Sequence, residues 1–231
     1  MPNIIDEEFG EIIIRRSPQA SSVKLRVAPN GKLRVSMPTY APLFLAKQLI
    51  KSNRNQLRDI LKKHDPVQDF YHEKQIGKSH KIIVITEDTA ETKVQKKGLN
   101  IVVHLAANDT LKDNHVIRMI RDECIKALRI EAKSYLPHRL KYMAKNHGFI
   151  YNKIRFSHSG GRWGSCNSQG TISLNIALMK LPFELIDYVL IHELSHTVQM
   201  NHSQDFWNVV SLCDPDYKQK RKILKSHSPT I

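Results

Sequence analysis

The sequence predicts an α+β protein with a β-rich N-terminal portion and a largely helical C-terminal half. Three observations support this class. Short segments of alternating apolar and polar residues occur before residue 110, as expected for half-buried strands. A long stretch with helical apolar spacing begins at Val116, and a His-Glu-x-x-His motif begins at His192. The second half therefore follows a helix, hairpin, helices order, which is an α+β pattern.

The N-terminal portion is predicted to begin with a β-hairpin followed by a helix. Residues 23–27 and 33–37 alternate apolar with polar side chains, and Pro29-Asn30-Gly31 between them is typical of a turn. From Pro42 to near Lys63 the apolar positions have the spacing of an amphipathic helix, namely Ala46, Leu49, Ile50, Leu57, Ile60 and Leu61.

A second group of strands is predicted before the middle of the chain. Residues 80–85 and 99–105 are rich in Ile and Val, and the polar connection between them is long enough for a middle strand. The polar stretch 108–114 that follows is the best candidate for a domain boundary. We therefore expect an N-terminal region at 1–110 and a second domain at 111–231.

The second half is predicted to open with a long helix. Its apolar positions continue to Pro137, which we expect to kink or end the helix before a further one to Lys145. Residues 153–157 and 171–175 then flank a glycine-rich segment, 159–166, and predict a hairpin beside the helix that carries the His-Glu-x-x-His motif.

The motif itself predicts a metal site. His192 and His196 are four residues apart, so on a helix they lie on one face and can bind one ion. Glu193 points elsewhere but is near enough to act as a general base on the water that a metal would activate. Apolar residues at 186, 189, 190 and 194 have helical spacing, and Pro182 suits a first helical position.

His202 is the expected third ligand, provided that the chain turns before it. Asn201 is a candidate left-handed helix terminator, and Ser203 with Asp205 predicts the cap and first turn of a new helix. Three histidines with an open fourth position are typical of catalytic zinc, although Ni, Co or Mn also suits such ligands. Gln199 occupies the position of the turn glycine in the longer zinc-protease motif, so the turn must be made differently.

Composition limits the partners and the compartment. The net charge of +14 is spread over both halves, which favours attraction to polyanions or acidic molecules but equally suits a solvated surface. Three cysteines without Cys-x-x-Cys spacing predict no disulfide framework.

The N-terminus lacks the pattern of a signal peptide, and no apolar stretch approaches the roughly 20 residues of a membrane span. We expect a cytoplasmic protein with no membrane partner.

The segments Arg162-Trp-Gly-Ser-Cys166, Gly170-Thr-Ile-Ser-Leu-Asn175, His192-Glu-Leu-Ser-His196 and Asn201-His-Ser203 with Phe206-Trp207 resemble the YgjP-like metal-dependent hydrolase family. The resemblance covers most of the chain and extends to SprT-like and other zincin metallopeptidases. It implies a zincin-like catalytic half, with His192, His196 and His202 as ligands and Glu193 as the catalytic residue. Asn167 stands where many members have serine, and this difference does not affect the metal ligands.

The substrate remains open between two chemistries that one metal site permits. A peptidase would use Arg162 to stabilise an oxyanion, whereas a nucleoside-triphosphate pyrophosphohydrolase would use it to grip phosphate. The alternative to both is that Arg162 forms a structural ion pair and has no role on the substrate side. A basic, nucleic-acid-associated protein with secondary or lost catalysis is a third hypothesis, although the sequence has no recognised nucleic-acid-binding motif.

Four further residues of this region are candidates for a role on the substrate side or behind the ligands. We expect Trp163 to pack beneath the motif helix rather than stack on a base, and Cys166 to be a small buried apolar residue rather than a nucleophile. The remaining two candidates are Ser165 and His158.

Overall fold

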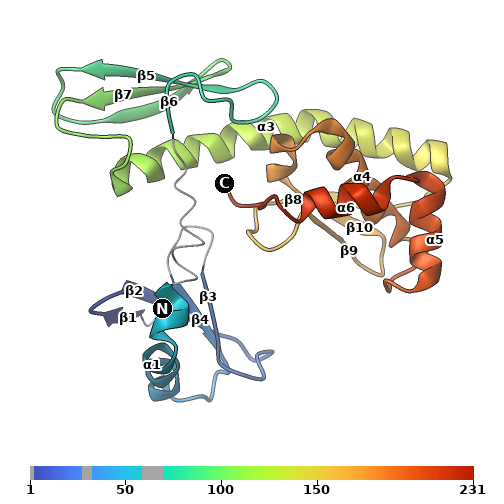
Figure 1. Cartoon of the computed structure of the whole chain (residues 1–231), viewed down its shortest axis with the longest axis horizontal. Coiled ribbons are helices and arrows are strands. Elements are labelled where there is room, and N and C mark those ends of the chain that lie inside the picture. Colours follow the sequence, from blue (N-terminus) through green and yellow to red (C-terminus); the bar gives the residue numbers. More distant parts are fainter. Residues whose placement is uncertain (1–2, 28–32, 59–69) are drawn as a thin grey trace. The chain divides into compact units, whose positions relative to one another are not determined.

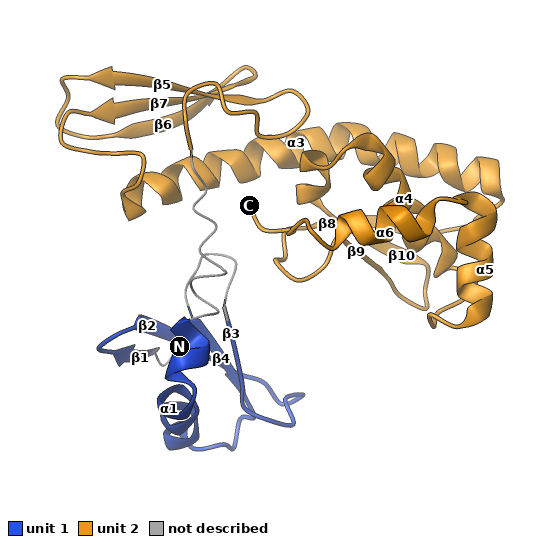
Figure 2. Cartoon of the chain, viewed as in Figure 1, with its two compact units in different colours: residues 1–68 blue, residues 69–231 orange. Residues whose placement is uncertain are grey.

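The computed structural model describes residues 3–27, 33–58 and 70–231. Helices occur together with three small sheets (Figure 1), which confirms the predicted α+β class. The chain divides into two compact units, Met1–Gln68 and Asp69–Ile231 (Figure 2). No helix among the described residues combines the length and apolar character needed to cross a membrane.

The first unit contains a four-stranded sheet in the order β1-β2-β4-β3. The predicted hairpin is confirmed, because β3 pairs antiparallel with β4, with Leu25 opposite Val35. Its expected turn lies outside the described residues. The sequence did not predict the other two strands, of which β2 runs parallel to β4. The elements of this unit are β1 (Asn3–Asp6), β2 (Gly10–Arg16), β3 (Lys24–Val27), β4 (Leu33–Met37) and helix α1 (Leu43–Ser52).

Helix α1 covers one face of this sheet with its apolar side. Residues 54–58 are helical again, but Asn53 interrupts the helix, since its backbone N–H bonds to the carbonyl of Ile50. The continuous helix expected from Pro42 is therefore divided, and its predicted end near Lys63 lies outside the described residues. The unit has its own core, formed by Ile12, Ile14, Leu33, Val35, Met37, Ala41, Ala46, Ile50 and Leu57.

The second unit begins with a three-stranded sheet in the order β5-β7-β6. The expected middle strand is present as β6 (Lys93–Lys97), which pairs antiparallel with β7 (Asn100–Ala106). Strand β5 (Lys81–Glu87) runs parallel to β7 on its other side.

The boundary expected near residue 110 is wrong. The side chains of Ile82, Ile101 and Val103, from the β5–β7 sheet, belong to the same buried cluster as Val116 and Ile120 of the following helix. The sheet therefore shares a core with the C-terminal half, and the chain divides into its two compact units between residues 68 and 69 instead. The polar stretch 108–114 is a surface connection within one unit.

Helix α3 (Asn114–His147) continues through Pro137, where we expected a kink or an end. Proline removes one backbone hydrogen bond and disfavours a helix interior. Burial of Leu136, Leu140 and Met143 extends the apolar face beyond this point, so tertiary packing outweighs the lost bond. The helix ends at Gly148, which has the left-handed conformation typical of a C-terminal glycine.

The sheet nearest the metal-site motif has the order β8-β10-β9. We expected β8 (Lys153–Ser157) and β10 (Thr171–Asn175) to form a hairpin, but they are parallel. The hairpin is instead formed by β9 (Gly164–Cys166) and β10, which are antiparallel. The connection between β8 and β10 is long enough to cross over and to supply the extra strand. Strand β9 consequently lies at the edge of this sheet.

Four helical segments complete the second unit. They are η1 (Ile176–Lys180), α4 (Phe183–Ser195), α5 (Gln204–Cys213) and α6 (Tyr217–Leu224). Arg139 on α3 fixes α4 through two parallel hydrogen bonds to Asp187, at 2.8 and 2.7 Å. Such a bidentate pair specifies orientation as well as contact. The motif helix is thus attached to the longest helix of the fold.

A buried carboxylate joins α3 to the loop before β5. Glu131 accepts hydrogen bonds from the backbone N–H groups of Lys78, Ser79 and His80, and its Oε1 lies 2.6 Å from the His80 Nδ1 atom. Burial raises the pKa of Glu131, but these hydrogen bonds outweigh burial and hold it below its ordinary value. Gly77 is required here because a Cβ atom would lie 2.2 Å from the Glu131 Oε2 atom.

Replacing Glu131 with glutamine is expected to lower the free energy of unfolding of this unit by about 1–3 kcal/mol at pH 7. A carboxylate with a lowered pKa stabilises the fold fully above its unfolded pKa, about 4.3, and loses this contribution as pH falls through the folded value. Wild type and variant should therefore converge in acid. Urea unfolding at pH 7 and pH 3, followed by tryptophan fluorescence, measures the difference. An equal loss at both pH values would contradict this role for the charge.

Candidate metal centre

Three histidines come together in the second unit. The ligand nitrogens of His192, His196 and His202 all lie within 4.8 Å of one another, and they are the three-residue metal-binding group found among the described residues. Helix α4 supplies His192, and His196 follows as its C-terminal cap with helical backbone angles. The two imidazoles therefore share one face, as their spacing predicts.

The turn that brings His202 to this group starts earlier than expected. Hydrogen bonds from Val198 N and Gln199 N to the Ser195 carbonyl close the helix without a glycine. Asn201 is not left-handed, since Glu73 is the one non-glycine residue with positive φ among those described. The prediction that Asn201 terminates the helix is therefore wrong. The cap by Ser203 is confirmed, because its side chain accepts from the Phe206 N–H at the start of α5.

Two aromatic side chains of helix α5 pack against the three imidazoles. The fully buried Phe206 ring stacks on His196, with centroids 4.4 Å apart, and contacts His192 and His202 edge-on at 5.0 and 4.8 Å. Trp207 stacks on His202 at 5.7 Å. The sequence placed these rings in a helix, but their role beneath the ligands depends on the turn before α5.

The donor set fits a divalent metal. Burial lowers the pKa of His192 to about 3, and the neighbouring charges add to the effect, so its imidazole is neutral and free to donate a lone pair. The Nε2 atoms of His192 and His202 are 3.1 Å apart, close to the roughly 3.3 Å between nitrogens in a tetrahedral site with bonds of about 2.0–2.1 Å. The Nδ1 atom of His196 bonds to the Gln199 carbonyl at 3.1 Å, which orients its ring.

Glu193 lies beside this group without a partner for one of its oxygens. The residue is 5% exposed, and its Oε2 atom has no hydrogen-bond partner among the described residues. Burial raises the pKa of Glu193 to about 8, opposed by the positive charge of Arg162. A buried, unpartnered carboxylate with a raised pKa is suited to accept a proton near neutral pH.

Strand β9 determines where the Glu193 carboxylate can lie. A Cβ atom on Gly164 would be 2.5 Å from the Glu193 Oε1 atom and 2.7 Å from its Cγ atom. Only glycine therefore permits the observed distance between the strand and the side chain. The sequence included Gly164 in a glycine-rich segment but gave no indication of this contact.

The loop that carries Arg162 is held by Asn175, at the end of β10. The buried Asn175 amide donates to the carbonyls of Ser159 and Arg162, at 2.7 and 3.0 Å, and its oxygen accepts from the Ala177 N–H at 3.0 Å. Its own N–H bonds to the Trp163 carbonyl. We infer that Asn175 is a positioning residue for the loop. The sequence indicated such a role only in that Asn175 is a polar residue at the end of an otherwise apolar strand.

Replacing Asn175 with alanine is expected to destabilise the unit by about 1–3 kcal/mol, because two loop carbonyls and one backbone N–H lose their partner. The activity of the protein should fall as well, since the Arg162 loop would move relative to Glu193. Thermal unfolding and activity of the purified variant measure both effects. Asn146→Ala, at an exposed position on α3, is the control, and identical behaviour of the two variants would contradict the positioning role.

The remaining predicted residues lie around this loop in different environments. Trp163 is partly buried against the core, as expected of a packing residue. Burial and the charge of Glu193 raise the pKa of Cys166, which disfavours a reactive thiolate. Ser165 pairs with Ser173 across the β9–β10 hairpin. His158 is an exposed residue directly after β8, desolvation and the charges of Arg121 and Arg129 lower its pKa, and it is not part of the three-histidine group.

Three histidines from a helix and its following turn, with a buried carboxylate beside them, define a candidate metal-dependent hydrolase. The family comparison agrees: the model described as YgjP-like, metallopeptidase domain, matches residues 21–227. The chain belongs to the YgjP-like family. The expectation drawn from the sequence segments is therefore confirmed.

Comparison with solved structures found similarity to the metallopeptidase zymogen abylysin of Pyrococcus abyssi. The two chains are 26% identical, and the match covers 39% of this chain and 92% of that chain with a TM-score of 0.36. No curated protein matched the sequence.

Proposed function

We propose that this protein is a zinc-dependent peptidase in which His192, His196 and His202 hold the metal and Glu193 is the general base. The observation that carries the proposal is the buried Glu193 carboxylate, with one oxygen unpartnered, next to three converging imidazoles. Membership of a metallopeptidase-domain family supports the same reaction class.

The chemistry divides between the metal and the residues of the chain. A bound divalent metal supplies Lewis acidity for a substrate carbonyl and for the attacking water. Glu193 takes the proton from that water, which its raised pKa favours, and then returns the proton to the leaving amine. Arg162, whose charge acts on Glu193, would stabilise the oxyanion that develops on the carbonyl oxygen.

The edge strand supports a peptide as the substrate. In the described part of the chain, β9 pairs with β10 on one side and with no strand on the other. An extended peptide can add to such an edge through main-chain hydrogen bonds. Because Gly164 on β9 lies against Glu193, a peptide bound there would present its backbone carbonyls beside the general base.

The metal and the compartment are further parts of this proposal. Zinc suits three imidazoles and an open position, while cobalt, nickel and manganese are alternatives for the same ligands. The cysteines Cys124, Cys166 and Cys213 are free, which supports activity in the reducing cytoplasm. Hydrolysis of a nucleoside triphosphate would use the same histidines and Glu193, and Arg162 would then contact phosphate.

The proposal is tested by loading the purified protein separately with zinc, cobalt, nickel and manganese. Each form is assayed in parallel against a peptide library and a nucleoside-triphosphate panel. We expect peptide cleavage that a chelator abolishes and zinc restores. Pyrophosphate or phosphate release without peptide cleavage would favour the nucleotide alternative. Salt-sensitive nucleic-acid binding without either activity would favour the nucleic-acid-associated alternative.

A further inference from the structure

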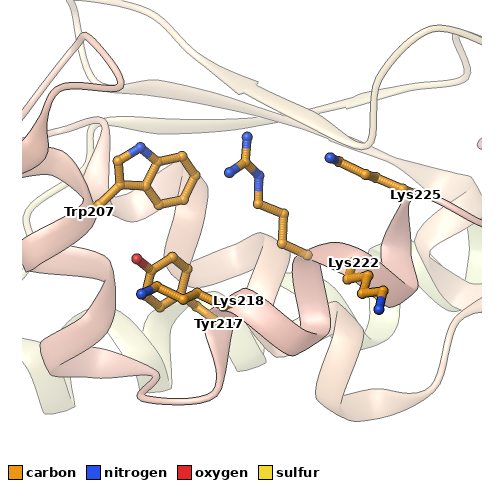
Figure 3. A pocket seen from close by; sticks show the side chains of 6 residues that line it. Trp207, Tyr217, Lys218, Lys222 and Lys225 are labelled. Atoms are coloured by element: carbon orange, nitrogen blue, oxygen red, sulfur yellow. The ribbon is translucent and has the colours of Figure 1, made fainter.

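A basic pocket lies next to the three histidines, on the side of α5 and α6. Its volume is about 280 Å³, and its lining residues are Trp207, Tyr217, Lys218, Arg221, Lys222 and Lys225. Figure 3 shows the rings of Trp207 and Tyr217 toward one end and Lys222 and Lys225 toward the other. Four of the six lining residues are cations, and the lining contains no acidic residue.

The four cations come from one face of α6 and its C-terminal cap. Lys218, Arg221, Lys222 and Lys225 have the spacing i, i+3, i+4 and i+7, which places them on one side of a helix. Like charges at this spacing repel one another. Among the described residues, none of the four forms an ion pair with a carboxylate. This face therefore concentrates positive charge that the described residues do not neutralise.

Trp207 connects this basic face to the metal centre. The centroid of the Trp207 ring lies 5.7 Å from that of His202 and 5.8 Å from that of His192, and the same side chain lines the pocket. The Tyr217 ring stacks on Trp207 at 5.4 Å, and the Arg221 guanidinium lies 4.6 Å from the indole centroid. The pocket thus begins one side chain away from the proposed site of cleavage.

The contacts and the size of the pocket indicate the kind of ligand. Because the indole is already in contact with Tyr217, Arg221 and His202, its faces are poorly placed to stack on a nucleobase. At about 280 Å³ the pocket is slightly smaller than the roughly 300–1,000 Å³ typical of small-molecule sites. It suits an acidic side chain or two rather than a whole nucleotide.

We propose that this pocket is a substrate subsite for acidic side chains of a peptide. The proposal rests on the peptidase function proposed above and adds a preference for substrates with acidic residues. An extended chain advances about 3.3–3.4 Å per residue, so an acidic residue within about three positions of the cleaved bond would reach the lysines. The result is a peptidase that favours glutamate or aspartate near the scissile bond.

The test measures peptide binding in the whole 231-residue chain loaded with zinc, with Glu193→Gln present to prevent turnover. Two labelled peptides are compared, one with several glutamates and one with glutamine at the same positions. The pocket variant carries Lys218→Gln, Lys222→Gln and Lys225→Gln. Its control carries Lys133→Gln, Lys141→Gln and Lys145→Gln, which removes the same charge from exposed positions on α3.

We expect the acidic peptide to bind about tenfold more tightly than the amide peptide at low salt. The pocket variant should lose this preference, whereas the control should keep it. The preference should also disappear in 1 M salt, where the Debye length is about 3 Å. Because binding is measured without turnover, failure of the peptide-cleavage screen would not be mistaken for failure of the subsite.

Three results would overturn the subsite. Equal binding of the two peptides to the unmodified pocket would show that it does not select acidic side chains. An equal loss of preference in the control would assign the effect to overall charge. Competition by inorganic triphosphate, together with no preference for the acidic peptide, would assign the pocket to phosphate instead.

Discussion

Replacing Glu193 with glutamine is expected to lower kcat by about 10²–10⁴-fold, the usual contribution of a general base. The amide has nearly the shape of the carboxylate, so it fits against Gly164, but it cannot accept the proton of the attacking water. The three histidines are unchanged, and zinc should remain bound in equal stoichiometry. Steady-state peptide hydrolysis and metal content of the purified variant measure the two effects.

Glu184→Gln provides the matched control for this substitution. Glu184 is exposed in the first turn of the same helix, so the chemical change is identical but occurs away from the metal centre. This variant should retain full activity. Undiminished turnover in the Glu193→Gln variant would contradict the assignment of Glu193 as the general base. Loss of zinc from this variant would show that Glu193 instead supports the metal ligands.

Replacing Gly164 with alanine is expected to lower kcat/KM by about 10²-fold without any change to the proposed metal ligands or to the proposed general base. The new methyl group would lie 2.5 Å from the Glu193 Oε1 atom, so the carboxylate or strand β9 must move. A misplacement of about 1 Å in an active site can cost this much in rate. Overpacking should also lower the free energy of unfolding by about 1–3 kcal/mol.

Gly161→Ala separates this contact from a general effect of losing a glycine in the loop. A Cβ atom at Gly161 would meet no atom within 4 Å, so activity and stability should stay near wild type. Activity assays and thermal unfolding of both variants give the comparison. If Gly164→Ala retained wild-type kcat/KM, the close approach between β9 and Glu193 would have no catalytic importance.

The local features of the metal centre could be predicted from the sequence because they depend on neighbouring residues. The spacing of His192 and His196 defines one helical face, and the Ser203 cap defines the start of the next helix. The turn between them was predicted in outline but with the wrong terminator, since the hydrogen bonds of Val198 and Gln199 to Ser195 replace the expected left-handed residue.

Features that depend on long-range packing could not be predicted in the same way. Apolar alternation identified β8 and β10 as strands, but nothing in their residues specifies that they are parallel. Nor do they specify that β9, which lies between them in the sequence, pairs with β10. The contact of Gly164 with Glu193 and the bonds of Asn175 to the Arg162 loop follow from that pairing. Both become visible only once the sheet is formed.

The core shared by α3 and the β5–β7 sheet determines how the protein can be shortened. A fragment starting at residue 111 would retain every proposed metal ligand, yet it would expose to water the apolar side chains of α3 that Ile82, Ile101 and Val103 help to bury. It would also lack the Lys78–His80 backbone that binds Glu131. The compact unit that carries the three histidines therefore starts at Asp69, and the β5–β7 sheet is an obligatory part of its core.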